Sequence, residues 1–214
     1  MITDISQLDL NGRYSYADYK TWNLRERVEL IMGKIFRMTP APREDHQRIS
    51  TALVGEFYNF LKGRKCNVYS APFDVRFPEE NKSEDGEIKT VVQPDICVIC
   101  DQKKIDERGC KGAPDLIVEI VSENSVKKDL HEKFDLYERS GVHEYWIVHP
   151  VDKTLIIYYL DKHGKYQPSR LFTSGDIVHS RSLPGLTLSL DVIFQNLSKE
   201  PEEEYKIKEI RLDP

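Results

Sequence analysis

The sequence predicts a mixed α and β domain in which one central sheet is flanked by two long helices. Two segments, at residues 43–62 and 125–140, repeat apolar residues at helical spacing, and shorter β-rich segments lie between and after them. The chain has 214 residues, of which 39% are hydrophobic and 31% charged, a globular composition large enough for its own core. We expect one domain over residues 1–198, followed by a charged tail over residues 199–214.

The first elements expected along the chain are a short helix and a hairpin. The helix covers residues 15–22, with Ser15 as its N-terminal cap. Residues 27–32 and 34–38 are strand-like and are separated by Gly33, which favours a turn.

The first long helix is expected over residues 43–62. Gly63 follows it and suits a helix C-terminus. The apolar positions of this helix are Ile49, Leu53, Phe57, Phe60 and Leu61. Strand-like segments then follow at residues 68–77, 90–100 and 115–122, and the polar segment between the first two predicts a loop at residues 79–89.

The second long helix is expected over residues 125–140 and ends at Gly141. Its apolar positions are Val126, Leu130, Phe134 and Tyr137. Residues 144–148 and 154–160 then predict a hairpin, and further short strands end near Leu190.

The balance of charge excludes one class of nucleic-acid-binding protein. The chain has 31 basic and 36 acidic residues and a net charge of −5, which excludes a protein that grips phosphates along a broad basic face. It does not exclude an enzyme that meets phosphate through a metal, because a bound cation reverses the local sign of charge. No apolar run reaches the ~20 residues of a membrane span, and the N-terminus carries no signal pattern. We therefore expect a cytoplasmic protein without a membrane partner.

Four cysteines occur in the chain, at positions 66, 97, 100 and 110. With no export signal, we expect all four to be reduced. Cys97 and Cys100 have the spacing of a zinc pair, but residues three apart on a strand point to opposite faces. Small buried side chains are therefore favoured over a zinc site.

Two acids interrupt segments that otherwise read as apolar strands. Asp95 follows Gln93-Pro94, and Glu119 has two apolar residues on either side, as in a central strand covered on both faces. An ionised carboxylate in such a strand is costly unless it is paired or bound to metal. The alternatives are a salt bridge to Arg or Lys and a metal site.

Carboxylates on neighbouring strands can together hold one Mg²⁺, which polarises a phosphodiester and lowers the pKa of water. A nearby lysine could then orient or deprotonate that water. Lys133 on the second long helix is the candidate, because it shares a helical band with Asp129 and Tyr137. The alternative for Lys133 is a surface ion pair with Asp129.

An ordered series of segments resembles the Uma-two family, which belongs to the restriction-endonuclease-like PD-(D/E)XK nuclease superfamily. The resemblance covers roughly residues 14–195. The segments that carry it are Val28 to Ile35, Pro40 to His46, Gln93-Pro94-Asp95, Pro114 to Ser122, Asp129, Lys133, Tyr137 and Gly141 to Val148.

The resemblance implies a restriction-endonuclease-like core of mixed sheet flanked by helices, with divalent-metal-dependent cleavage of DNA. It assigns Asp95 and Glu119 as ligands of Mg²⁺ or Mn²⁺, with the main-chain carbonyl of Ile120 as a third ligand. It also suggests a homodimer, since two sites are convenient for cutting two strands.

At one position the sequence departs from the superfamily pattern. The usual lysine two residues after the second acid is replaced by Val121, and the resemblance assigns the role to Lys133 instead. Glu29 and His46 also match family positions. Glu29 is implied as an outer or second-metal ligand, with an exposed strand acid as the alternative. His46 shares a helical band with apolar residues, so it is either a buried core histidine or a partner that orients the acids.

Three functions follow as hypotheses. The first is a metal-dependent DNA endonuclease using Asp95, Glu119 and Lys133. The second is a catalytically weak or inactive module on the same fold that binds nucleic acid or a protein partner. The third is a different hydrolase or lyase that uses His46 with acids, although no ordered motif supports it.

Overall fold

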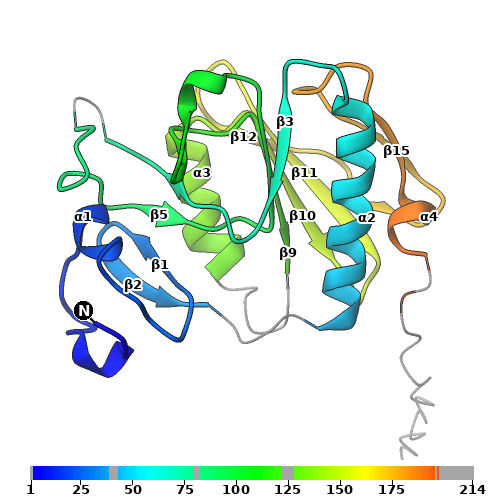
Figure 1. Ribbon diagram of the computed structural model, residues 1–214. Coiled ribbons are helices and arrows are strands. Elements are labelled where there is room, and N and C mark those ends of the chain that lie inside the picture. The colour runs from blue at the N-terminus through cyan, green and yellow to red at the C-terminus, as the bar shows by residue number, and fades with distance from the viewer. Residues whose placement is uncertain (1, 39–42, 80–81, 122–127, 196, 198–214) are drawn as a thin grey trace, which may run out of the picture.

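The computed structural model describes residues 2–38, 43–79, 82–121, 128–195 and 197, with the backbone alone at 128–130. Its architecture is mixed α and β, as predicted. Two main sheets, of seven and six strands, form most of the molecule, and a third sheet has two strands. Figure 1 shows the larger sheet between two long helices and the smaller sheet to one side.

The larger sheet has the strand order β12-β11-β10-β9-β6-β3, with β13 beside β11. Only β9 and β10 pair in parallel among these strands, and α3 lies between them in sequence. The strands are β3 (Asn67–Ser70), β6 (Ile96–Ile99), β9 (Leu116–Ile120), β10 (Glu144–His149), β11 (Thr154–Leu160), β12 (Tyr166–Pro168) and β13 (Phe172–Thr173).

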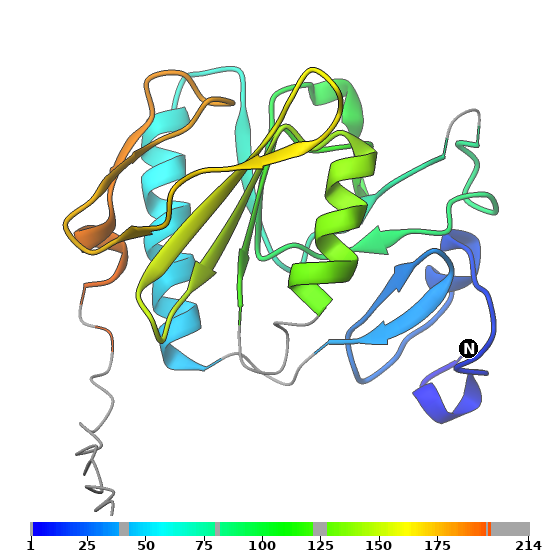
Figure 2. The same ribbon diagram turned by 180° about the vertical axis from the view of Figure 1, so that it is seen from behind.

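Two helices, α2 (Glu44–Leu61) and α3 (Phe134–Ser140), cover opposite faces of this sheet (Figures 1 and 2). Successive strand side chains alternate between faces. Val118 therefore packs in the core beneath α2, whereas Ile117 packs in the core beneath α3. Every residue of β9 is buried, so the prediction of a central strand covered on both faces is confirmed.

The smaller sheet has the order β2-β1-β5-β4-β8-β7 and lies on the α3 side of the molecule (Figure 1). The expected hairpin forms its edge and turns through Gly33, whose φ of 78° is easily adopted by glycine. The strands are β1 (Val28–Ile31), β2 (Lys34–Arg37), β4 (Val75–Arg76), β5 (Val91–Val92), β7 (Ile105–Asp106) and β8 (Gly109–Lys111).

Two segments expected to be continuous strands are each divided between the two sheets. The first becomes β3 and β4, and the second becomes β5 and β6. A proline lies at each break, Pro72 and Pro94, and a proline cannot donate a hydrogen bond to a strand ladder. As a result, Asp95 lies where the chain passes from the smaller sheet into the larger one. The hairpin β7–β8 was not predicted.

The second long helix also differs from its prediction. Residues 122–127, where the helix was expected to begin, lie outside the described residues. The described part starts with a π-helix, η3 (Lys128–Lys133), and continues as α3 to Gly141, which closes it in the left-handed conformation. A π-helix is wider than an α-helix and is frequent at functional sites. Lys133 lies at the junction of the two.

The remaining elements are short. Ser15 caps α1 (Tyr16–Tyr19), as predicted, and forms a capping box with Asp18, but the helix ends at Tyr19 and not at the predicted Trp22. The others are η1 (Ile5–Gln7), η2 (Gln102–Lys104), β14 (Ile177–His179), β15 (Thr187–Ser189) and α4 (Leu190–Ile193). The tail predicted over residues 199–214 lies outside the described residues. Within the described ranges, no helix is both long and apolar enough to cross a lipid bilayer.

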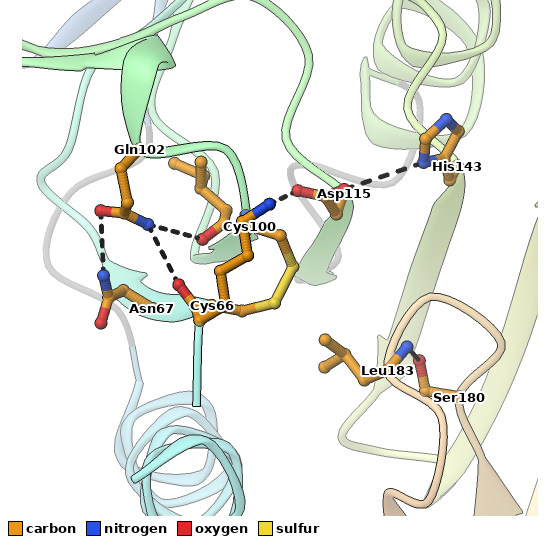
Figure 3. Close-up of a disulfide and its surroundings, with 10 residues drawn as sticks. Cys66, Asn67, Cys100, Gln102, Asp115, His143, Ser180 and Leu183 are labelled. Atoms are coloured by element: carbon orange, nitrogen blue, oxygen red, sulfur yellow. Dashed lines mark hydrogen bonds and ion pairs between the residues drawn. A yellow bond between two sulfur atoms is a disulfide. The ribbon is translucent and has the colours of Figure 1, made fainter. Parts of the chain in front are cut away.

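The expectation of four reduced cysteines is wrong for two of them. Cys66 and Cys100 form a disulfide with their Cα atoms 3.9 Å apart (Figure 3). Continuing the register of β3 and β6 by one residue places them directly opposite each other. Their separation of 34 residues in sequence contains no sign of this neighbourhood, which depends on strand pairing. Cys97 and Cys110 are free and buried, and no zinc site forms among the described residues.

Candidate active site

Asp95 and Glu119 come from neighbouring antiparallel strands. Ile96 pairs with Val118, and continuing this register by one residue places Asp95 opposite Glu119. The N–H of Ile120 donates to Oδ2 of Asp95 at 2.8 Å, which fixes this carboxylate against the end of β9.

His46 contacts Asp95 from the first turns of α2. Its Nε2 lies 3.2 Å from Oδ2 of Asp95, and the two side chains are 15% and 20% exposed. Nδ1 of His46 is buried and has no hydrogen-bond partner among the described residues. His46 faces inward, as its helical band with apolar residues indicated. Of the two alternatives for this histidine, its contact with Asp95 favours a partner that orients an acid.

Lys133 is the cation that lies closest to Glu119 among the described contacts. Its Nζ is 2.7 Å from Oε1 of Glu119, and both residues are 3% exposed. The alternative of a surface position for Lys133 is therefore wrong, while the side chain of Asp129 lies outside what the structure describes. The salt bridge considered for Glu119 does form, and Lys133 is the partner. Buried charges are tolerated when they are paired in this way.

Glu29 joins the same cluster from the smaller sheet. Its side chain is fully buried in β1, so the alternative of an exposed strand acid is wrong. Oε1 of Glu29 lies 3.2 Å from Nζ of Lys133 and accepts the main-chain N–H of Gln93 at 2.8 Å. One lysine amine therefore lies between two buried carboxylates, one from each main sheet.

Tyr137 contacts the same carboxylate as Lys133; the sequence analysis placed it on the helical band of Lys133 and in the family resemblance but gave it no role in the site. Its hydroxyl donates to Oε1 of Glu119 at 2.7 Å. Burial raises the pKa of this hydroxyl well above its ordinary value, and the neighbouring charge of Glu119 adds to the shift. The hydroxyl therefore remains a donor. The four-residue spacing from Lys133 was the signal that could have indicated this contact, because it places both side chains on one helix face.

Only one described contact joins the parts of the predicted metal site, from the Ile120 N–H to the Asp95 carboxylate. Among the residues that the structure describes, no three His, Cys, Asp or Glu side chains form a group that could hold a metal ion. The donors implied by the sequence are the carboxylates of Asp95 and Glu119 and the carbonyl of Ile120. These are hard oxygen atoms of the kind that Mg²⁺ prefers, with water completing its shell. The donor chemistry therefore fits the expected ion.

A solved structure with the same fold supports this architecture. It is the crystal structure of a protein from Anabaena variabilis ATCC 29413, described as "a putative nuclease belonging to DUF820". The match has a TM-score of 0.64 and 21% identity, and it covers 84% of this chain and 97% of the other. At this identity the likeness shows a shared fold.

Sequence comparison finds a relative and a family. The relative is "Uncharacterized protein slr1290" of Synechocystis sp., 24% identical over 189 residues that make up 87% of this chain and 94% of the other. The family model is Uma2, described as "Putative restriction endonuclease", and it matches residues 16–191. This range includes the elements that carry Glu29, Asp95 and Lys133. The chain belongs to the Uma2 family.

Proposed function

We propose that this protein is a divalent-metal-dependent endonuclease that hydrolyses DNA phosphodiester bonds. The observation that carries the proposal is the buried contact of Lys133 with Glu119 on β9, next to Ile120, whose N–H donates to Asp95. The family description and the nuclease-like fold support the same class of enzyme.

Asp95, Glu119 and the carbonyl of Ile120 would hold the metal, Mg²⁺ or Mn²⁺. When bound, such an ion polarises the phosphodiester and lowers the pKa of water at the site. Asp95 is the more exposed of the two acids, with 20% of its side chain accessible against 4% for Glu119. DNA and solvent therefore approach from the side of Asp95.

Val121 stands at the strand position where the superfamily usually has a lysine. Lys133, on the following helix, takes the role of that lysine. Its amine is held at 2.7 Å from Glu119 and is close enough to orient water beside that carboxylate or to offset charge on the phosphate. Glu29 and Tyr137 position this pair, one by contact with the amine and the other by donating to Glu119. His46 positions Asp95 in the same manner.

The direct test is cleavage of supercoiled plasmid DNA with Mg²⁺ or Mn²⁺ and with EDTA. We expect cleavage only with metal, and a loss of about 100-fold or more in Asp95→Asn, Glu119→Gln and Lys133→Met. Glu107→Gln is the matched control, because the Glu107 side chain is 86% exposed. Metal-dependent cleavage that survives Glu119→Gln would contradict the proposal.

The second candidate is a catalytically weak or inactive module on this fold that binds nucleic acid or a protein partner. The buried ion pair of Glu119 and Lys133 favours it, because such a pair can be retained for structure alone. DNA binding without cleavage, whichever divalent metal is added, would support the inactive binding module. Loss of cleavage in His46→Ala with full activity in Asp95→Asn would instead favour the hydrolase or lyase based on His46. Assembly as a homodimer stays a prediction.

A further inference from the structure

A pocket of about 680 Å³ opens beside α1, within the size range of about 300–1,000 Å³ for small-ligand sites. Its wall is built from the segment between α1 and β1, together with side chains that come from the smaller sheet and its loops. None of its lining residues has a role in the cleavage chemistry proposed above.

One wall of the pocket is aromatic. Tyr19 and Trp22 both line it and are half-buried, with ring centroids 5.9 Å apart. Tyr16, which is 2% exposed and also lines the pocket, stacks against Tyr19 with ring centroids 5.9 Å apart. Tyr14 meets Trp22 edge-on at 5.1 Å. The rings of Tyr19 and Trp22 are therefore held in place and offer an aromatic surface on which a planar ligand can stack.

Part of the pocket lining is polar, and it includes Gln93, whose side-chain amide has a defined orientation. Nε2 of Gln93 donates to Oδ1 of Asp74 at 2.9 Å and to the hydroxyl of Tyr19 at 3.3 Å. These two contacts fix which end of the amide carries the nitrogen. Oε1 of Gln93 is then a buried acceptor without a partner among the described residues.

Three cations line the pocket, in a chain whose net charge is −5. They are Lys20, Arg27 and Arg108, all three of them exposed, and two acids also line the pocket, Glu26 and Asp74. Lys20 and Arg108 share the carboxylate of Asp85, at 2.6 and 3.4 Å. Arginine and lysine side chains around an aromatic surface are the pattern by which proteins hold the phosphates and bases of single-stranded nucleic acid.

The pocket adjoins the candidate active site through Gln93. The side chain of Gln93 lines the pocket, while its main-chain N–H donates to Glu29 at 2.8 Å. Glu29 in turn contacts Lys133 at 3.2 Å. Gln93 therefore connects the pocket to the ion pair of Glu29 and Lys133 in the candidate active site.

We propose that this pocket binds one unpaired nucleotide of the DNA substrate, with its base against Tyr19 and Trp22 and its phosphates beside Arg27. The inference rests on the proposed nuclease function and adds a substrate preference to it. The protein selects DNA that already contains an unpaired nucleotide or that yields one easily, because an unpaired base costs least to unstack.

The test compares two dye-labelled duplexes of the same sequence, one fully paired and one with a single unpaired nucleotide. Binding is measured by fluorescence anisotropy in EDTA, so the result does not depend on metal or cleavage. We expect the second duplex to bind at least about tenfold more tightly, as one base stacked on an aromatic side chain would give. Trp22→Leu should abolish this preference, and Trp22→Tyr should retain it.

A second readout uses the two tryptophans of the chain. Trp22 lines the pocket, whereas Trp146 is fully buried in the core. Binding of the duplex with the unpaired nucleotide should quench fluorescence in the natural protein and leave it unchanged in Trp22→Tyr, where Trp146 alone emits. This readout decides the question even if Trp22→Leu fails to fold.

Arg27→Glu and Arg64→Glu form a matched pair of charge reversals. Arg64 follows the end of α2 and lies over the Phe60 ring, and α2 and α1 are on opposite sides of the molecule (Figure 1). Arg27→Glu should weaken binding of the duplex with the unpaired nucleotide about tenfold more than Arg64→Glu does.

Equal affinity for the two duplexes, or a preference that survives Trp22→Leu, would overturn the pocket assignment. Failure of the pocket assignment can be distinguished from failure of the proposed nuclease function. Metal-dependent cleavage without a preference in EDTA would reject the pocket alone. A preference in EDTA without any cleavage would reject the nuclease chemistry alone.

Discussion

Lys133 lies between two buried carboxylates, Glu29 and Glu119, with 4% or less of each of the three side chains exposed. Removing one partner from such a group leaves an uncompensated buried charge, which costs about 3–5 kcal/mol in proteins generally. The lysine therefore serves stability as well as any chemistry. For this reason, the cleavage rate of a Lys133 variant has to be compared together with its free energy of unfolding.

Tyr137 offers a cleaner separation of activity from stability. Tyr137→Phe keeps the packing of the ring and removes only the hydroxyl that donates to Glu119. We expect cleavage to fall about 10- to 100-fold, as for other residues that orient a metal-binding carboxylate, and the free energy of unfolding to fall by about 1 kcal/mol. Cleavage kinetics and urea denaturation measure the two quantities. Tyr58→Phe is the control, since Tyr58 is 60% exposed, and an equal loss in both variants would contradict the assignment.

The cysteines allow a test by alkylation. Burial raises the pKa of Cys110 to about 11 and the pKa of Cys97 well above its ordinary value. Because a raised pKa leaves less thiolate at a given pH, only about one Cys110 thiol in a thousand is ionised at pH 8. We expect no alkylation of these two residues by iodoacetamide in the folded protein at pH 8, and the thiolate fraction of Cys110 reaches about half only near pH 11.

Mass spectrometry of the unfolded chain completes this test. Without reductant, two alkyl groups should be added, on Cys97 and Cys110, and after reduction four. Four additions without reductant would show that Cys66 and Cys100 are free thiols, as the sequence alone indicated.

At the scale of elements, two buried strand acids have different surroundings. Glu119 in β9 meets a lysine and a tyrosine, whereas Glu144 in β10 is surrounded by neutral donors. The Glu144 carboxylate accepts four hydrogen bonds, which come from Trp146 Nε1, Ser180 Oγ, Arg181 N and Ser182 N at 2.7–2.9 Å. Glu144 thereby ties the loop after β14 to the larger sheet.

Glu144→Gln is therefore expected to affect stability and not catalysis. Hydrogen bonds to a charged group contribute about 1.5–3 kcal/mol, so we expect a loss of this order in the free energy of unfolding. Cleavage by the folded variant should be unchanged. Urea denaturation and cleavage kinetics distinguish this pattern from that of Glu119→Gln, in which cleavage is lost. A catalytic defect at Glu144 in folded protein would show that the site extends further than proposed.

At the scale of the whole molecule, a bound ion should stabilise the fold. A ligand that binds only the folded state adds about 2.7 kcal/mol at 100 times its Kd. We expect Mg²⁺ or Mn²⁺ to raise the Tm of the natural protein and of the control Glu107→Gln, but not that of Asp95→Asn. Isothermal titration calorimetry gives an independent measure. No uptake of either ion, or uptake that Asp95→Asn leaves intact, would reject the metal assignment.

Much of the fold was predictable from local patterns. The helix α2 and the β10–β11 hairpin have clear periodicities, and both formed as expected. The divided strands were less predictable, because the sequence at Pro72 and Pro94 shows where a ladder can break but not which sheet each half joins. The beginning of the second helix cannot be compared, since residues 122–127 lie outside the described residues.

The sequence by itself determined the mixed fold, the buried position of Glu119 and the short set of candidate site residues, because periodicity and misplaced charges are local properties. Only the tertiary structure decided which of these residues meet. Glu29 and Lys133 are far apart in sequence and come together because two sheets pack around α3, and Cys66 meets Cys100 through strand register. Contacts of this kind depend on how elements pack, and local spacing carries no information about packing.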